Sequence, residues 1–314
     1  MSLRSIGNIF SNFDDYRSTT GTKASTVAGA GPSPITASGG NQTTASGFTN
    51  GGYKYHVFTS SGALTVSSGS GDIEFLVVAG GGGGGWGNGG AGGAGGLRTN
   101  DPGVPAPIRI SDPVSLSPGP YTITVGDGGA SNDSPFSNRT GGNSSIGSLV
   151  VASGGGGGGP TSTASDMDGG SGGGQQGSAA GDSIASPDGL TPTVQGSAGG
   201  TRDGGGGGGG ASQVDGPIQT SSPYNPSSGA AGLNCPAFSS PIIHPNCPMP
   251  SKWQTYVGSN GMYAQGGWGY PNRGSSWNDP EPHGGIANTG GGADADPSPS
   301  ITGGKGIVII RYPA

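Results

Sequence analysis

Two runs of six glycines constrain this chain more than any other feature of its sequence. Each follows the same apolar tetrapeptide, LVVA: residues 76–79 precede Gly80–Gly85, and residues 149–152 precede Ser153 and Gly154–Gly159. Glycine loses more backbone entropy on ordering than any other residue. These runs are therefore either unordered linkers or segments whose packing has no room for a side chain.

The spacing of glycine between residues 81 and 96 distinguishes these alternatives. Glycine occupies every third position from 81, and also positions 89, 92 and 95, while Asn88, Ala91 and Ala94 occupy the remaining register. A polyproline-II helix has three residues per turn, rises about 3.1 Å per residue and has no internal hydrogen bonds. In that conformation the segment has two bare edges, and its backbone groups must pair with neighbouring segments. We expect packed polyglycine-II helices; flexible linkers are the alternative.

Composition excludes several classes of protein. Glycine makes up 74 of 314 residues and hydrophobic residues 29%, which is typical of low-complexity or disordered chains. However, only 10% of residues are charged and the net charge is −6, which argues against the usual type of disordered chain. The four lysines and eight arginines are scattered singly, so we expect no nucleic-acid binding. The apolar runs are too short for membrane insertion. No signal peptide is visible, so we expect cytoplasmic synthesis and a delivery route other than secretion.

The chain divides into three parts by pattern. Residues 1–20 form an arm or one short amphipathic helix, residues 21–50 read as a linker rich in Ser, Thr, Gly and Ala, and residues 51–314 form one glycine-rich domain. The predicted arm could attach the chain to a larger particle. Its apolar residues recur at roughly helical spacing: Leu3, Ile6, Ile9, Phe10 and Phe13.

The predicted fold class is mostly β and irregular, with almost no α-helix: a module of short strands at 51–152, polyglycine-II helices and loops at 153–305, and a closing strand at 306–312. The closing strand has the composition of a strand buried on both faces, and we expect it to pair with strands around residues 53–79. The expected strands are 53–59, 63–67, 73–79, 107–111, 121–125, 145–152 and 306–312.

The sequence offers little for catalysis. Glu74 and Glu281 are the only glutamates, the three histidines occupy unrelated contexts, and no glycine run is followed by the Lys-Ser/Thr pair of a phosphate loop. We therefore expect no enzyme activity and no cofactor. Cys235 and Cys247 are the only cysteines. A disulfide between them is favoured over a zinc site with His244, whose spacing matches no familiar metal motif.

Aromatic residues gather in one stretch of polar and glycine residues. Such a composition is typical of recognition surfaces, but these rings could equally form a small core beneath long loops. The candidate receptor-binding residues are Trp253, Tyr256, Tyr263, Trp268, Tyr270 and Trp277.

Two stretches carry a family resemblance. YHVFTSSGALTVSSGSGDIEFLVVAGGGGGG from Tyr55 and GGKGIVIIRY from Gly303 resemble the glycine-rich domain of bacteriophage tail-fibre and virion proteins, over about residues 51–314. The chain is also similar to T-even-type fibre-tip adhesins, in which polyglycine helices form a sandwich and the intervening loops bind the host. Residues 1–50 lie outside the resemblance.

The resemblance implies a cyanophage or other phage virion protein, a tail fibre or fibre-tip adhesin exposed on the particle. Its implied partners are other virion proteins of the tail, fibre or capsid, a bacterial surface glycan or protein, and further copies in a homotrimer. Loops within 217–280 would meet the receptor. The alternative is a head fibre or capsid-decorating protein without a specific receptor. A fibre-borne depolymerase is disfavoured because paired carboxylates are missing.

Overall fold

The computed structural model divides the chain into two units, Met1–Ser33 and Pro34–Ala314. All described residues belong to the second unit, and the five apolar residues of the predicted anchor lie outside them. The described ranges are 34–85, 89–106, 108–130, 139–159, 166–177, 179–202, 205–212, 228–269, 285–295 and 301–314.

The central sheet has five strands in the order β2-β3-β16-β6-β7, and all neighbours are antiparallel. The C-terminal strand β16 lies in its middle and pairs with both β3 and β6, which confirms the predicted closure. Six of its seven residues are buried, as the composition IVIIRY predicts. The strands are β2 (Phe48–Asn50), β3 (Tyr53–Phe58), β6 (Glu74–Val78), β7 (Leu97–Thr99) and β16 (Ile307–Pro313).

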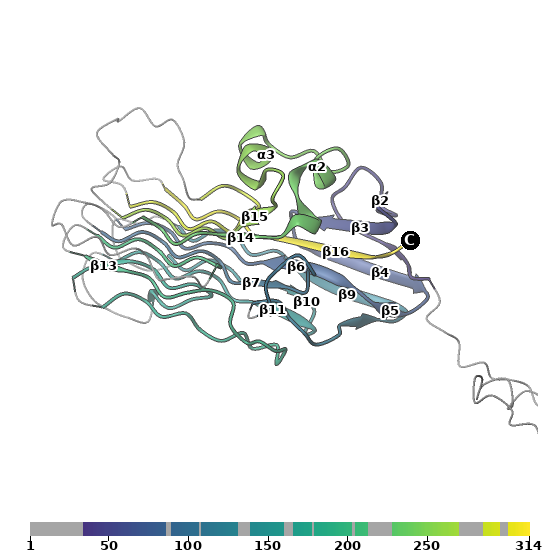
Figure 1. Cartoon of the computed structure of the whole chain (residues 1–314), viewed down its shortest axis with the longest axis horizontal. Coiled ribbons are helices and arrows are strands. Elements are labelled where there is room, and N and C mark those ends of the chain that lie inside the picture. The colour runs from purple at the N-terminus through teal and green to yellow at the C-terminus, as the bar shows by residue number, and fades with distance from the viewer. Residues whose placement is uncertain are drawn as a thin grey trace, which may run out of the picture. The chain divides into compact units, whose positions relative to one another are not determined.

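A second sheet with the order β1-β4-β9-β10-β11 packs on one face of the central sheet (Figure 1). The interface contains alternate side chains of the central sheet, such as Phe75, Val77, Val308 and Ile310. The strands are β1 (Thr36–Ser38), β4 (Gly62–Ser68), β9 (Gly119–Thr124), β10 (Ser144–Ile146) and β11 (Val150–Ala152).

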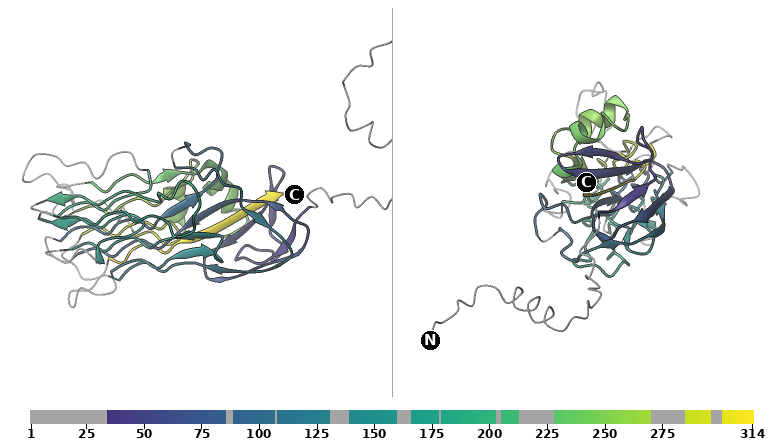
Figure 2. Two further views of the ribbon diagram at one scale, coloured as in Figure 1. Left: turned by 90° about the horizontal axis from the view of Figure 1, so that it is seen from below. Right: turned by 90° about the vertical axis from the view of Figure 1, so that its right-hand side faces the viewer.

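A short helical segment covers the opposite face of the central sheet, so that face is buried as well (Figures 1 and 2). It contains η2 (Pro236–Phe238), α2 (Ser240–Ile243) and α3 (Ser251–Val257). Three two-stranded pairings complete the described secondary structure: β5 (Gly71–Asp72) with β8 (Ser115–Leu116), β12 (Gln175–Gln176) with β13 (Thr201–Arg202), and β14 (Leu233–Asn234) with β15 (Met262–Tyr263).

The glycine segments continue from the sheets as long, nearly parallel chains (Figure 1). Their hydrogen bonds repeat every three residues: donors three residues apart in segment 80–85 reach acceptors three residues apart on one neighbour, at N···O distances of 2.7–3.4 Å. Three residues per turn is the period of a polyproline-II helix. The bonds are Gly80 and Gly83 to Gly142 and Arg139, Gly81 and Gly84 to Gly304 and Ile301, and Gly82 and Gly85 to Gly93 and Gly90.

Two glycine segments are enclosed on all sides by others. Segment 79–85 is hydrogen-bonded to segments 89–96, 126–130, 139–143, 153–159, 290–295 and 301–306. Segment 89–96 is bonded to segments 79–85, 153–159, 169–175, 205–211, 264–269 and 290–295. Consecutive neighbours around each ring are also bonded to each other, which gives hexagonal packing. We call these segments, with 196–200 and 228–231, the glycine lattice.

Composition follows position in the lattice. The two enclosed segments contain only glycine and alanine, whereas the outer segments 126–130, 139–143 and 301–306 carry Asp, Arg, Thr, Asn, Ile and Lys. A Cβ placed on Gly82 or Gly93 would lie closer than 3.0 Å to backbone atoms of a neighbouring segment. The lattice therefore requires glycine because its backbones pack against one another, and this packing rules out free linkers for the described runs.

The unit has two distinct ends. Strands β6, β9 and β11 lead into the lattice, and lattice segments lead back into β7, β10 and β16 at the same end of the sandwich. The chain enters at Pro34 and leaves at Ala314 on the opposite side, because Thr36 pairs with Ser68 and Ala314 donates to Gly52. We call the end of the lattice that points away from the sandwich its far end. This far end therefore lies away from both Pro34 and Ala314.

Four local predictions are corrected by the structure. Residues 34–50, expected in a linker, belong to the compact unit, because β1 and β2 each pair with a sheet strand. Expected strand 107–111 contains a turn, since Ile108 and Arg109 both donate to Pro105. Expected strand 145–152 is a hairpin that turns at Gly147, with φ +53°. Helices α2 and α3 were not expected.

Candidate functional site

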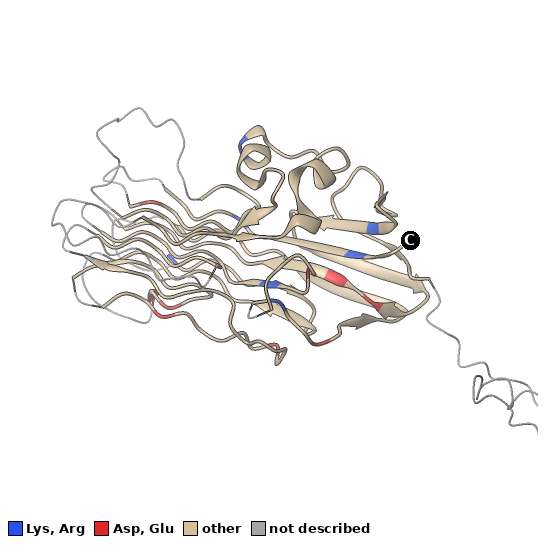
Figure 3. Ribbon diagram, viewed as in Figure 1, with Lys and Arg blue, Asp and Glu red and all other residues tan. Residues whose placement is uncertain are grey.

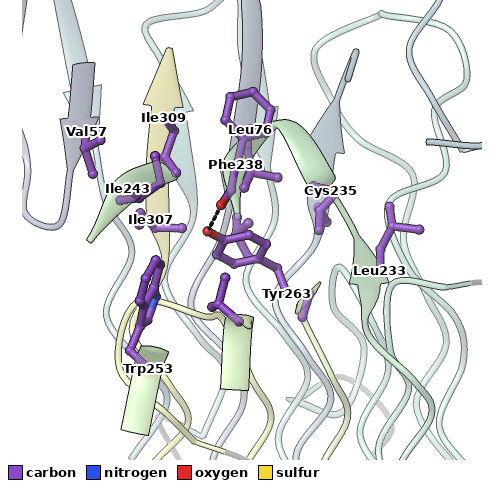
Figure 4. Close-up of a cluster of buried hydrophobic side chains, with 14 of the residues drawn as sticks. Val57, Leu76, Leu233, Cys235, Phe238, Ile243, Trp253, Tyr263, Ile307 and Ile309 are labelled. Carbon is purple, nitrogen blue, oxygen red and sulfur yellow. Dashed lines mark hydrogen bonds between the residues drawn. The ribbon is translucent and has the colours of Figure 1, made fainter. Parts of the chain in front are cut away.

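The aromatic stretch divides into core and lattice residues. Trp253 of α3 and Tyr263 of β15 have 0% exposure and pack edge to face, with ring centroids 6.3 Å apart. The Tyr263 hydroxyl donates to the Phe238 carbonyl at 2.7 Å, and the Trp253 indole N–H donates to the Asn288 carbonyl at 2.9 Å. Figure 4 shows both rings among side chains of the central sheet. The receptor-binding prediction is wrong for these two residues, because they form the core beneath the helices.

Two of the remaining aromatic candidates, Tyr256 and Trp268, are half-buried. Tyr256 packs against the same core, and burial raises the pKa of its hydroxyl, which donates to Gln265 at 3.1 Å. Trp268 is half-buried in lattice segment 264–269, and its backbone N–H donates to the Asp294 carboxylate at 2.8 Å. Tyr270 and Trp277 lie outside the described residues. Tyr256 and Trp268 are therefore the described aromatic candidates that retain partial exposure, and Trp268 is the one that lies in the lattice.

Both cysteines are free and buried, so the disulfide prediction is wrong. They have separate environments: the Cys247 thiol lies 3.7 Å from the Asn41 carbonyl, whereas Cys235 packs in the core near Asp101. Burial raises the pKa of Cys247 to about 11 and that of Cys235 well above its usual value. Both thiols therefore stay protonated at neutral pH and act as small apolar side chains.

The far end of the lattice brings together chain segments that are distant in sequence. Gly85 bonds to Gly90, Gly90 bonds to Gly159, and Gly159 bonds to Gly174. Gly206 joins this level by donating to Gln175. The described segments that border residues 86–88, 160–165 and 203–204 therefore end side by side. Figure 3 shows few charged residues along these segments.

At the opposite end of the sandwich, charged and aromatic residues converge. Arg311 of β16 forms an ion pair with Glu74 of β6 and donates to the Tyr55 hydroxyl at 2.9 Å. Its guanidinium also lies 4.2 Å from the centre of the Tyr53 ring. Glu74, Tyr53 and Asp72 help line a cavity of about 500 Å³ that sequence inspection did not identify, because its residues come from five separate segments.

The described residues contain no group of His, Cys, Asp and Glu side chains arranged to hold a metal ion. Among the same residues, no helix has the length and hydropathy needed to cross a bilayer.

Comparison with known proteins gives one match. Residues 58–313 match a family described as a glycine-rich domain, which is more than three quarters of the chain. No curated protein and no solved structure matches the chain.

Proposed function

Because the chain belongs to the glycine-rich domain family, we propose that it is a bacteriophage virion protein, a tail-fibre or fibre-tip adhesin that contacts the host surface. The β-sandwich connects to the particle side, the lattice is a rigid mount, and the far end presents the receptor-binding segments. The proposal assigns no catalysis to the chain.

One observation carries this proposal. The enclosed segments 79–85 and 89–96 are each hydrogen-bonded to six neighbours, and they hold the far end away from both Pro34 and Ala314. A support cross-linked through its backbone resists bending without a side-chain core. Such a support suits a protein that must hold binding segments at a fixed distance from its attachment point.

Trp268 is the described residue on which the receptor proposal can be tested. It is half-buried and precedes Gly269, where an added Cβ would meet Gly205 and Gly206 at the far end of the lattice. Partly exposed tryptophans held by their surroundings are typical binding hot spots, and their truncation commonly costs about 2 kcal/mol or more. Tyr270 and Trp277 follow in the same stretch of sequence and belong to the same proposal.

Three experiments test the proposed function. Immunogold labelling of purified particles with an antiserum against the full chain should mark the ends of tail fibres. Gold on the capsid would favour the capsid-decorating alternative, and particles without gold would contradict a virion role.

The proposed homotrimer predicts three times the chain mass in analytical ultracentrifugation; a monomer would contradict it.

The third experiment measures adsorption. Purified chain, added to a host strain before infection, should slow phage adsorption, and Trp268→Ala should weaken this competition at least tenfold. Val194→Ala is the matched control, because Val194 is an exposed apolar residue away from the far end of the lattice. Equal competition by both variants, with equal melting temperatures, would remove Trp268 from the receptor surface.

A further inference from the structure

The cavity at the sandwich end lies on the side away from the lattice. Its lining includes Tyr53 at the start of β3, Glu74 at the start of β6, Pro313 at the end of β16 and residues of segment 109–114. A volume of about 500 Å³ falls within the usual range of small-molecule sites. Nothing in the proposed adhesin function uses this end of the molecule for a ligand.

Hydrogen bonds hold the cavity walls in place. The Asn100 amide accepts from the Phe75 N–H at 2.9 Å and donates to the Ile73 carbonyl at 2.8 Å. The Asp112 carboxylate accepts from the Thr191 N–H at 2.6 Å. These contacts fix two polar side chains before any ligand arrives, and such preorganisation lowers the entropy cost of binding.

The lining retains unused hydrogen-bonding capacity of both kinds. Among the described contacts, Asp72 uses one carboxylate oxygen to accept from Ser115, and Asp112 uses one to accept from Thr191. Arg109 donates to the Pro102 carbonyl at 3.1 Å through one of its nitrogens. The second oxygen of each carboxylate and the other guanidinium N–H groups can therefore bond to a ligand.

The charges narrow the class of ligand. The negative charges of Asp72 and Asp112 disfavour the binding of an anion such as phosphate, and the positive charge of Arg109 disfavours the binding of a simple cation. Glu74 is already paired with Arg311. The remaining lining contributes apolar surface from Tyr53, Ile110, Pro113, Val114 and Pro313. The complementary ligand is uncharged, has several groups that both donate and accept, and has an apolar face.

We propose that this cavity is a saccharide-binding site for one or two sugar rings. Sugar hydroxyls can donate to the free oxygens of Asp72 and Asp112 and accept from Arg109, while the C–H face of the ring packs on the apolar lining. The site is separate from the far end of the lattice. It does not depend on the adhesin proposal.

Saturation-transfer NMR on the full chain tests this site directly. The probes are D-glucose, D-galactose, L-rhamnose, N-acetyl-D-glucosamine and a disaccharide, with arginine methyl ester and inorganic phosphate as charged competitors. At least one sugar should receive saturation and bind with a millimolar dissociation constant. The double variant Asp72→Asn, Asp112→Asn should weaken that binding at least tenfold, because it replaces both anionic acceptors with neutral amides.

Asp182→Asn is the matched control, because Asp182 is an exposed carboxylate outside the cavity lining, and it should bind like the unmodified chain. No saturation of any sugar would overturn the proposal. So would sugar binding that the double variant leaves unchanged while its melting temperature is also unchanged. Preferential binding of arginine methyl ester or phosphate would also overturn the proposal, because the preferred ligand of the cavity would then be charged.

Discussion

The sandwich and the glycine lattice solve the same packing problem by opposite means. In the sandwich, side chains from two sheets and two helices fill the interior, and residues such as Leu76, Phe75 and Ile309 are fully buried. In the lattice, the interior consists of backbone, and segments 79–85 and 89–96 bond to six neighbours each. A compact interior therefore needs complementary surfaces, which side chains or bare backbones can supply.

The two regions should respond to mutation in opposite directions. Protein cores lose stability when large side chains are made smaller, because cavities form. The lattice has the reverse constraint: an added methyl group at Gly82 would collide with the Gly156 backbone. Small-to-large changes should therefore be most damaging in the lattice, and large-to-small changes most damaging in the sandwich.

The largest expected effect is loss of folding on Gly82→Val. The new side chain would push apart the neighbours of an enclosed segment, and disruption of several backbone hydrogen bonds should exceed a domain stability of about 5–15 kcal/mol. Gly62→Val is the matched control, because a Cβ there would lie 3.9 Å from the nearest atoms, on the Phe58 ring. Circular dichroism and solubility of the two variants provide the comparison.

Gly206→Val should behave like Gly82→Val, since an added Cβ would meet the Gly200 carbonyl. If either lattice variant melted at the temperature of the unmodified chain, the proposed contrast between the regions would be wrong.

In the sandwich, Leu76→Ala should lower the free energy of unfolding by about 2–5 kcal/mol. Leu76 is fully buried in the cluster under the helices, and truncation leaves a cavity. Leu76→Met preserves volume and should cost less than about 1.5 kcal/mol. Urea denaturation measures both, and equal losses would argue against a close-packed core.

In the lattice, the corresponding truncation should be mild. Ala94→Gly removes one buried methyl group from segment 89–96, and burial of such a group stabilises by about 0.8 kcal/mol. We expect a loss of about 1 kcal/mol in urea denaturation, with the hydrogen bonds of the segment unchanged. A loss as large as that of Leu76→Ala would mean that side chains also hold the lattice together.

The sequence predicted most of the fold through patterns local to one segment. The glycine period at 81–96 indicated threefold packing, and IVIIRY indicated a strand buried on both faces; the hydrogen bonds and the burial agree with these. Helices α2 and α3 have four and seven residues. Such short helices depend on tertiary contacts, here those of Ile243 and Trp253, rather than on their own periodicity.

The parts of the fold and of the cavity that the sequence did not predict depend on contacts between distant segments. Strands β1 and β2 have three residues each, and each buries one side chain, Ala37 or Phe48. The two enclosed segments contain only glycine and alanine, which carry little information about their neighbours, so the order of segments in the lattice could not be predicted. The cavity residues Asp72, Asn100 and Asp112 are likewise brought together only by the fold.

The smallest expected effect is a dependence of stability on pH in the sandwich. His56 is buried, with Nδ1 2.8 Å from the Gly39 carbonyl and Nε2 2.9 Å from the Tyr312 hydroxyl. Burial lowers the pKa of His56 below its usual 6.5. The unfolded chain therefore binds a proton at a higher pH than the folded chain, and stability should fall as pH decreases below 6.5.

Melting temperatures of the unmodified chain and of His56→Gln, measured between pH 7.5 and 5, separate this effect from carboxylate titration. The variant should lose less stability over this interval because it lacks the titrating ring. Parallel curves for the two proteins would show that His56 does not contribute.

Amide hydrogen exchange, measured by NMR on the full chain, tests the central claim most directly. The account predicts that Gly82, Gly92 and Gly93 of the enclosed segments exchange as slowly as Val308 and Ile309 of β16, because their N–H groups are buried and bonded to other backbones. Exchange of these glycines at the rate of an unstructured peptide, while β16 remains protected, would contradict it.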